Sequence, residues 1–282
     1  MNPSAERRFC IAGLEVCVRA GPGSGLNHME GFYHHVPSQG GSPQCVVDVD
    51  IRPDFHHGRT RGPNYPGFEE THLGPGRMLF SRFDVEGEIT VDGSASPQVH
   101  GTFIVGHSPN SLEAAIRVAV SIALPAVGAL IFHSSAVAGN DGIAQLFMGV
   151  SGRGKSTIAT MLTNIGATKV SDELVIVRTT PAGAEAIVSP FIGSVGLPYG
   201  KSFPISALNM LVQASQHHRR PIAVPEALPQ LMRHTVSFAR EPTIIQSILD
   251  LQLALLAAVP CYELEFAKRA DVADAIFLTC QG

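Results

Sequence analysis

The clearest chemical pattern in this sequence is a glycine-rich segment, GVSGRGKST at residues 149–157. It satisfies G-x-x-x-x-G-K-[ST], in which the glycines let backbone N–H groups curl around a phosphate chain and the following helix adds its unpaired donors. In such a segment the lysine, here Lys155, reaches the terminal phosphates, and the hydroxyl of Ser156 coordinates Mg²⁺. The pattern therefore predicts a nucleotide site whose contacts to ATP come from Gly149, Ser151, Gly152, Arg153, Gly154, Lys155, Ser156 and Thr157.

An acidic pair follows this segment at short range. The apolar run 167–170 ends at Ser171-Asp172-Glu173. A strand that enters directly from the helix after the glycine-rich segment is expected to lie beside the strand before it, with the carboxylates near the terminal phosphate. Asp172 can then take a proton from an acceptor hydroxyl or hold Mg²⁺ through water. The alternative is an ordinary acidic turn at the end of a strand.

The elements around the two motifs follow from hydrophobic periodicity and turn residues. Residues 142–148 read as a buried strand, and residues 155–164 as a helix that Gly166 ends. Strands are expected at 168–171 and 174–178, so that the glycine-rich segment lies between a strand and a helix, as phosphate binding requires.

The chain changes character near residue 108. Residues 1–108 are predicted to be β-rich and loop-rich, with strands at 46–51, 78–83 and 87–91 and long loops at 21–43 and 53–76. From 109 to 282 strands alternate with helices, which is typical of an α/β domain. In that part we expect a helix capped at Asn110 and stopped before Pro125, a strand at 129–132, helices at 205–214, 243–259 and 270–278, and a strand at 262–266.

Composition narrows the class of protein. Of 282 residues, 45% are apolar and 16% charged, so burial can offset chain entropy and gross disorder is excluded. The net charge of -4 and the absence of a Lys/Arg cluster argue against a nucleic-acid partner. The apolar stretch 118–132 is interrupted by Ser121, Pro125 and Gly128, so no membrane partner is predicted. Five scattered cysteines without C-x-x-C spacing predict a reduced, cytoplasmic protein without structural zinc.

Four segments together resemble the catalytic domain of HPr kinase/phosphorylase and its HPr-kinase-like relatives, which share a fold with PEP carboxykinase. They are HSSAV at 133–137, the glycine-rich segment, VSDELV at 170–175 and VPCYELEF at 259–266. The resemblance covers residues 109–282 and implies an α/β, P-loop kinase core that moves a phosphoryl group from ATP to a hydroxyl, typically of a serine. It implies Asp172 as the base, Lys155 and His133 near the phosphates, and Ser156 as the metal-binding hydroxyl.

The chain also departs from the family. HPr kinases carry two aspartates where this chain has Asp172-Glu173, and the longer Glu173 is expected to reach the metal instead. The segment 189–196 lacks the metal-binding glutamate of the family's later glycine-rich segment, which leaves the second metal ligand and any phosphorylase activity open. Because residues 1–108 do not match the family's N-terminal domain, HPr is not the expected acceptor.

The sequence thus predicts an ATP- and Mg²⁺-dependent phosphotransferase acting on a serine or threonine hydroxyl of a peptide or protein, with residues 1–108 helping to recognise the acceptor. One alternative is a kinase of a small hydroxylated metabolite. Another is an ATP-binding sensor or scaffold without transfer activity. By analogy with the family, a homo-oligomer is also an open expectation.

Overall fold

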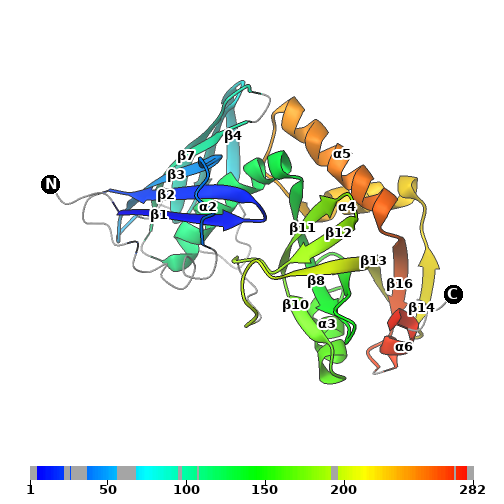
Figure 1. Ribbon diagram of the computed structural model, residues 1–282. Coiled ribbons are helices and arrows are strands. Elements are labelled where there is room, and N and C mark those ends of the chain that lie inside the picture. Colours follow the sequence, from blue (N-terminus) through cyan, green and yellow to red (C-terminus); the bar gives the residue numbers. More distant parts are fainter. Residues whose placement is uncertain are drawn as a thin grey trace. The chain divides into compact units, whose positions relative to one another are not determined.

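Two β-sheets, each with its own helices, organise the chain in the computed structural model, which is mixed α/β and rich in strands (Figure 1). The structure describes residues 5–21, 26, 37–55, 68–94, 97–106, 108–191, 196–269 and 271–277. One compact unit comprises Met1–Val127 and Ser237–Ile245, and the other Gly128–Val236 and Gln246–Gly282. The division thus falls at 127/128 instead of the predicted 108/109, because the helix after residue 108 packs on the first sheet.

The first unit is built on a seven-stranded sheet of order β1-β2-β3-β7-β6-β5-β4. Its strands are β1 (Ala5–Ile11), β2 (Leu14–Ala20), β3 (Cys45–Ile51), β4 (Glu69–Gly74), β5 (Arg77–Arg82), β6 (Val85–Val91) and β7 (Val99–Val105). The predicted strands 46–51, 78–83 and 87–91 are confirmed as β3, β5 and β6. The prediction of a loop throughout 53–76 is wrong, since it contains β4, an exposed edge strand without an apolar face. The predicted loop 21–43 lies largely outside the described residues.

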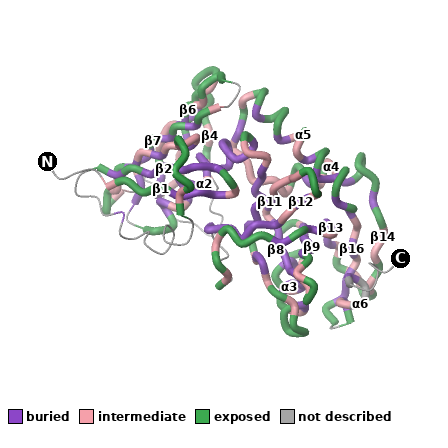
Figure 2. Tube along the Cα trace, in the orientation of Figure 1, coloured by how far each residue is buried: buried purple, intermediate pink, exposed green. Residues whose placement is uncertain are grey.

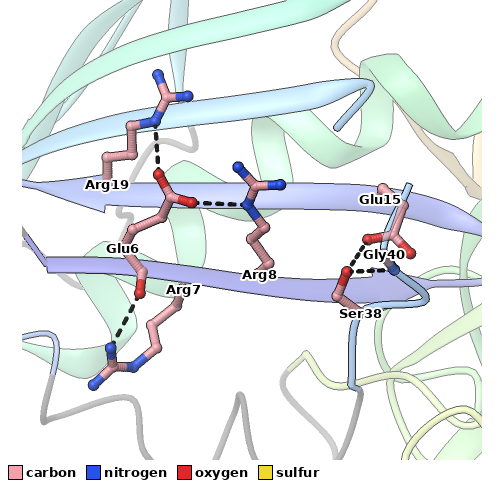
Figure 3. Close-up of polar contacts among 7 residues, drawn as sticks. All are labelled: Glu6, Arg7, Arg8, Glu15, Arg19, Ser38 and Gly40. Carbon is pink, nitrogen blue, oxygen red and sulfur yellow. Dashed lines mark hydrogen bonds and ion pairs between the residues drawn. The ribbon is translucent and has the colours of Figure 1, made fainter. Parts of the chain in front are cut away.

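A buried carboxylate ties the segment before β3 to β2 (Figure 3). Glu15 is only 6% exposed, and it accepts hydrogen bonds from the Ser38 hydroxyl at 2.5 Å and from the Gln39 backbone N–H at 2.7 Å. Glu6 on β1 is exposed instead, and pairs with Arg8 at 2.7 Å and Arg19 at 3.3 Å. The two glutamates share a sheet but differ in solvation, so they contribute differently to stability.

Helix α2 (Pro109–Ala123) supplies the apolar layer of the first unit by packing on β3, β6 and β7. Its cap is Ser108, whose hydroxyl accepts a bond from the Asn110 N–H, so the predicted cap at Asn110 is wrong; Pro109 suits the first helical turn. Together with the 3₁₀ turn η2 (Leu124–Val127), α2 is long and apolar enough to cross a membrane by length and composition alone, yet 72% of that window is buried in the protein. Its apolarity is therefore that of a core helix.

The second unit is built on a nine-stranded sheet, in which β10-β8-β11-β12-β13-β16-β14 form one path, β9 pairs with β8 and β13, and β15 pairs with β8. The strands are β8 (Ala129–Ala138), β9 (Ala144–Met148), β10 (Thr168–Ser171), β11 (Leu174–Thr180), β12 (Gly183–Ile187), β13 (Ser202–Gln213), β14 (His218–Pro221), β15 (Thr235–Val236) and β16 (Cys261–Phe266). Its helices are α3 (Lys155–Asn164), α4 (Val224–His234) and α6 (Val272–Phe277), together with α5 (Pro242–Ala258), which belongs to the first unit up to Ile245 and to the second from residue 246 on. The predicted strands 129–132, 142–148, 168–171, 174–178 and 262–266 and the helices 155–164 and 243–259 are confirmed, and the helix 270–278 is confirmed over α6.

The predicted helix 205–214 is wrong, because those residues belong to strand β13. The strand pairs in parallel with β9 and β16, and its five consecutive residues 207–211 are all buried, so side chains on both faces of the sheet are covered there. A strand buried in this way shows a continuous apolar run without alternation, and such a run does not distinguish a strand from a buried helix.

An apolar cluster of side chains fixes helix α3 against the strands of its unit. Its members come from α3, β8, β9, β13, β16 and α6: Val137, Phe147, Ile158, Ala159, Leu162, Leu211, Leu264, Phe266, Val272 and Ile276. Strand β9 is buried along its whole length (Figure 2). The loop between β9 and α3 is therefore held at both ends by the core.

Candidate nucleotide-binding site

The glycine-rich segment forms the turn from β9 into α3, as predicted. Gly152 and Gly154 have φ of 80° and 100°, a left-handed conformation that other residues adopt only with strain. Gly154 is the residue before α3, and no side chain caps the helix there. The first turn of α3 therefore presents its backbone N–H groups and the positive end of its dipole to the space before it, which suits a phosphate.

Three contacts from neighbouring elements set the shape of this loop. The buried Ser135 hydroxyl on β8 donates to the Lys155 carbonyl at 3.1 Å, and the Gln213 amide at the end of β13 donates to the Gly152 carbonyl at 2.7 Å. The Phe266 ring lies so close to Gly154 that a Cβ on that residue would be 2.5 Å from the ring. Gly154 is thus required both by backbone conformation and by packing.

A cavity of about 460 Å³ opens beside the loop and collects most of the predicted site residues. It is lined by His133, Ser151, Gly152, Gly154, Lys155, Ser156, Thr157, Asp172 and Glu173. The residues predicted as catalytic and as metal ligands all contribute to this one space. Two predicted nucleotide contacts, Gly149 and Arg153, line a second cavity instead.

Burial sets the charge state of the two basic groups in the first cavity. Lys155 is 8% exposed, and this burial lowers the pKa of its ammonium, while the negative charge of Glu173 opposes the shift. The ammonium donates to the Gly149 carbonyl at 2.8 Å. Burial and, next, the charge of Lys155 lower the pKa of His133, against a smaller opposing effect of Glu173, so this ring is neutral at pH 7. The cavity therefore has one ammonium, whose charge an anionic ligand would stabilise.

Asp172 holds a carboxylate oxygen ready for a further partner. Its Oδ2 is 3.3 Å from the Lys169 ammonium, whereas its buried Oδ1 has no hydrogen-bond partner among the described residues. A buried carboxylate oxygen without a donor is costly unless a ligand satisfies it. A donor hydroxyl or a metal-bound water in the cavity would supply that partner.

The strand that carries Asp172 and Glu173 to the cavity has a different neighbour in the sheet from the one predicted. Strand β10 does not lie beside β9, because β8 is between them: Ala136 on β8 pairs with Leu146 on β9 and with Ser171 on β10. The turn after β10 then returns toward the loop, where the Ser134 N–H donates to the Glu173 carbonyl at 3.0 Å. The predicted position of β10 is therefore wrong, although its carboxylates do line the cavity with Lys155.

His234, which is distant in the sequence, lines a cavity beside the glycine-rich loop and is not predicted from the sequence. β15 pairs antiparallel with β8, with Thr235 opposite Phe132, and this register brings His234 level with His133. Burial, followed by the charges of Lys155, His133 and Arg233, lowers the pKa of His234 to about 4. No local pattern marks His234 in the sequence, since the pairing of β15 with β8 brings it to the site.

The side chains that line the first cavity offer the type of donor atom that Mg²⁺ binds. The Ser156 hydroxyl, the Glu173 carboxylate and the unpartnered Asp172 Oδ1 are hard oxygen donors, the ligands that Mg²⁺ prefers. Within the described residues no group of three or more His, Cys, Asp or Glu side chains is arranged to hold a metal ion alone. Such a site would depend on substrate phosphates for further ligands, as is usual for Mg²⁺.

Fold and site together describe a mixed α/β protein with a glycine-rich loop between a buried strand and a helix, and a cavity with one lysine and two carboxylates beside that loop. Comparison of the chain with models of known protein families and with curated proteins gives no match.

Proposed function

We propose that this protein is an ATP-dependent phosphotransferase of the HPr-kinase-like type, which moves the γ-phosphoryl group to a serine or threonine hydroxyl of a peptide or protein. The observation that carries the proposal is the meeting of Lys155, Ser156 and Asp172 in one cavity at the start of α3. These are a phosphate-binding cation, a metal-binding hydroxyl and a base with a free oxygen, which are the groups that phosphoryl transfer requires.

Each residue has a defined part in the proposed reaction. The N–H groups of the loop and the Lys155 ammonium bind the phosphates and stabilise the charge of the transferring group. Asp172 orients the acceptor hydroxyl through Oδ1 and takes its proton as the hydroxyl oxygen bonds to the γ-phosphorus. The bond from that phosphorus to the β,γ-bridging oxygen breaks, and ADP leaves. Neutral His133 is a hydrogen-bond donor or acceptor beside the phosphates.

Ser156 and Glu173 would hold Mg²⁺, with Asp172 near it. When bound there, the ion would supply positive charge that offsets the negative charge of the phosphates. Glu173 lines the cavity and is the longer of the two neighbouring carboxylates, which supports its use as a ligand while Asp172 serves as the base.

The test is phosphoryl transfer from γ-labelled ATP with Mg²⁺ into a library of serine- and threonine-containing peptides. Wild type is expected to label a subset of peptides, and Lys155→Ala and Asp172→Asn are expected to lose the label. Glu185→Gln, on β12 and outside the cavity, is the control carboxylate and should label as wild type does.

Two other outcomes would redirect the account. Labelling of a small hydroxylated metabolite but no peptide would establish a metabolite kinase. Lys155-dependent ATP binding without labelling of any acceptor would establish a nucleotide sensor. Labelling that persists in Asp172→Asn at the wild-type rate would remove Asp172 as the base.

A further inference from the structure

A second cavity lies on the other side of the glycine-rich loop. Its volume is about 190 Å³, and it is lined by Met148, Gly149, Val150, Arg153, Met210, Leu211, Val212, Gln230, Arg233 and His234. The Lys155 ammonium, which lines the first cavity, bonds to the carbonyl of Gly149, which lines the second. The two spaces are therefore neighbours across the lysine side chain.

The charges that line this cavity are of one sign. Arg153 and Arg233 are cationic, and none of the lining residues is an aspartate or glutamate. Met148, Met210 and Leu211 are buried in its wall, at 0%, 3% and 5% exposure. Arg153 and Arg233 themselves are exposed, so an anion between them would gain chiefly from charge-assisted hydrogen bonds to two guanidinium groups at once.

Arg153 and Arg233 differ from the other described arginines in their side-chain hydrogen bonds and ion pairs. Every other arginine in the described part of the chain has a hydrogen bond or ion pair through its side chain. The Arg153 and Arg233 side chains have no hydrogen bond or ion pair with any described residue. Two unpaired guanidinium groups at one cavity, next to a phosphate-binding loop, point to a ligand with negative charge.

The loop itself directs Arg153 to this side. A Cβ on Gly149 would be 3.0 Å from the Arg153 Cβ and 3.5 Å from its Cγ, so the absence of a side chain at Gly149 lets the arginine stem cross there. This explains why Arg153, although it belongs to the glycine-rich segment, does not line the first cavity. The His234 ring adds a neutral polar edge, because its pKa is about 4.

We propose that the second cavity is an anion subsite, which holds a carboxylate or phosphate group of the phosphoryl acceptor between Arg153 and Arg233. The statement that the bound group belongs to a phosphoryl acceptor rests on the proposed function, whereas the binding of an anion in this cavity does not. A volume of about 190 Å³ suits one small group and not a nucleotide. The enzyme would thus select acceptors that carry a negative group near the reacting hydroxyl, because such a group would pair with two guanidinium groups that have no other anionic partner among the described residues.

The direct test is calorimetric titration of the full chain with inorganic phosphate, after the first cavity has been saturated with Mg²⁺ and the β,γ-imido analogue of ATP. Wild type is expected to bind one phosphate, and Arg153→Gln and Arg233→Gln are each expected to weaken that binding at least tenfold. Arg178→Gln on β11, which removes the same charge from a pair with Glu185, is the control and should bind as wild type does.

The same titration with acetate identifies the source of the negative charge. Binding of phosphate alone supports a phosphorylated acceptor, and binding of both anions supports an acidic side chain or a chain terminus. Absence of a phosphate site in the analogue-saturated protein would overturn the proposal, and so would a phosphate site that neither substitution weakens.

A second arrangement separates this proposal from the proposed function. If the chain does not bind the ATP analogue, the proposed function fails, and phosphate is then titrated into Lys155→Met without nucleotide. A phosphate site that is present in Lys155→Met and is lost in Lys155→Met/Arg233→Gln supports the anion subsite by itself. Loss of all phosphate binding in Lys155→Met overturns it.

Discussion

The Lys155 ammonium donates a hydrogen bond to the Gly149 carbonyl oxygen across 2.8 Å, so the lysine proposed to bind phosphate is held by the first residue of its own loop. One carbonyl is a weak substitute for phosphate oxygens, because an ammonium has three donors and is most stable beside negative charge. Burial without a full set of partners explains why the pKa of Lys155 is lowered. The arrangement is that of a binding group whose charge is costly until a ligand arrives.

Lys155→Met is therefore expected to separate stability from binding. The substitution keeps the apolar stem and removes a desolvated charge, so the free energy of unfolding should equal or exceed that of wild type. Affinity for Mg²⁺·ADP should fall at least a hundredfold. Urea denaturation and calorimetry measure the two effects, and a variant that is destabilised by more than about 1 kcal/mol would show instead that Lys155 is a structural residue.

Gly154→Ala tests the contact between the loop and Phe266. The new methyl group would be 2.5 Å from the ring in a backbone with φ of 100°, so both strain and a clash are expected. We expect a loss of about 2–4 kcal/mol in the free energy of unfolding and weaker nucleotide binding.

Gly166→Ala is the matched control for this substitution. Its φ is 103° and a Cβ there would contact nothing within 4 Å, so only the backbone strain of about 1–2 kcal/mol applies. Gly154→Ala combined with Phe266→Leu should regain part of the lost nucleotide affinity. Equal losses of stability in Gly154→Ala and Gly166→Ala would mean that the ring contact has no energetic effect.

His234 predicts a dependence of stability on pH. Its pKa is about 4 in the folded protein and 6.5 when unperturbed, so between these values the unfolded chain binds more protons. Its contribution to stability is full above pH 6.5 and is lost as the pH falls toward 4. The loss is at most about 3 kcal/mol and is reduced by the solvent that reaches the ring.

The measurement is the free energy of unfolding of wild type and His234→Gln at pH 7, 6, 5 and 4. The slope between pH 6.5 and 4 should be smaller in the variant. His218→Gln, which removes an exposed histidine from β14, should keep the wild-type slope. Identical slopes for all three proteins would mean that the His234 ring is not desolvated beside Lys155 and His133.

Glu15 and Glu6 form a matched pair for stability in the first unit (Figure 3). Glu15→Ala removes a buried acceptor of two hydrogen bonds, from Ser38 and the Gln39 N–H, and is expected to cost about 2–3 kcal/mol. Glu6→Ala removes exposed ion pairs and should cost much less. Thermal denaturation of both variants checks the order, and an equal or larger effect for Glu6→Ala would contradict it.

Local signals in the sequence were sufficient for the loop and its helix. Helix α3 has the predicted bounds, 155–164, because the glycines before it and Gly166 after it mark its ends, and burial of β9 accounts for the apolar run before the loop. The cavity residues near the loop, such as Lys155 and Ser156, follow from the same motif. Here each residue is placed by its neighbours in the chain.

Long-range pairing accounts for what could not be predicted. Residues 205–214 show a helix-like apolar run although nearly all of them belong to β13, because burial on both faces removes the alternation that is typical of a strand. The position of β8 between β9 and β10, and the approach of His234 to His133 through β15, depend on which strands pair, and single-chain periodicity has no information about that choice. The sequence does not predict the second cavity for the same reason, since Arg153 and Arg233 line a common space only in the folded chain.

The most direct test of the central claim compares ATP binding and phosphoryl transfer in Asp172→Asn and wild type. The substitution preserves the shape of the side chain and removes the base, so Mg²⁺·ATP affinity should change less than tenfold while single-turnover transfer to the best peptide falls at least a hundredfold. That result would identify Asp172 as the group that takes the proton of the acceptor. Transfer at the wild-type rate in Asp172→Asn, or the absence of transfer in wild type despite tight ATP binding, would contradict the account.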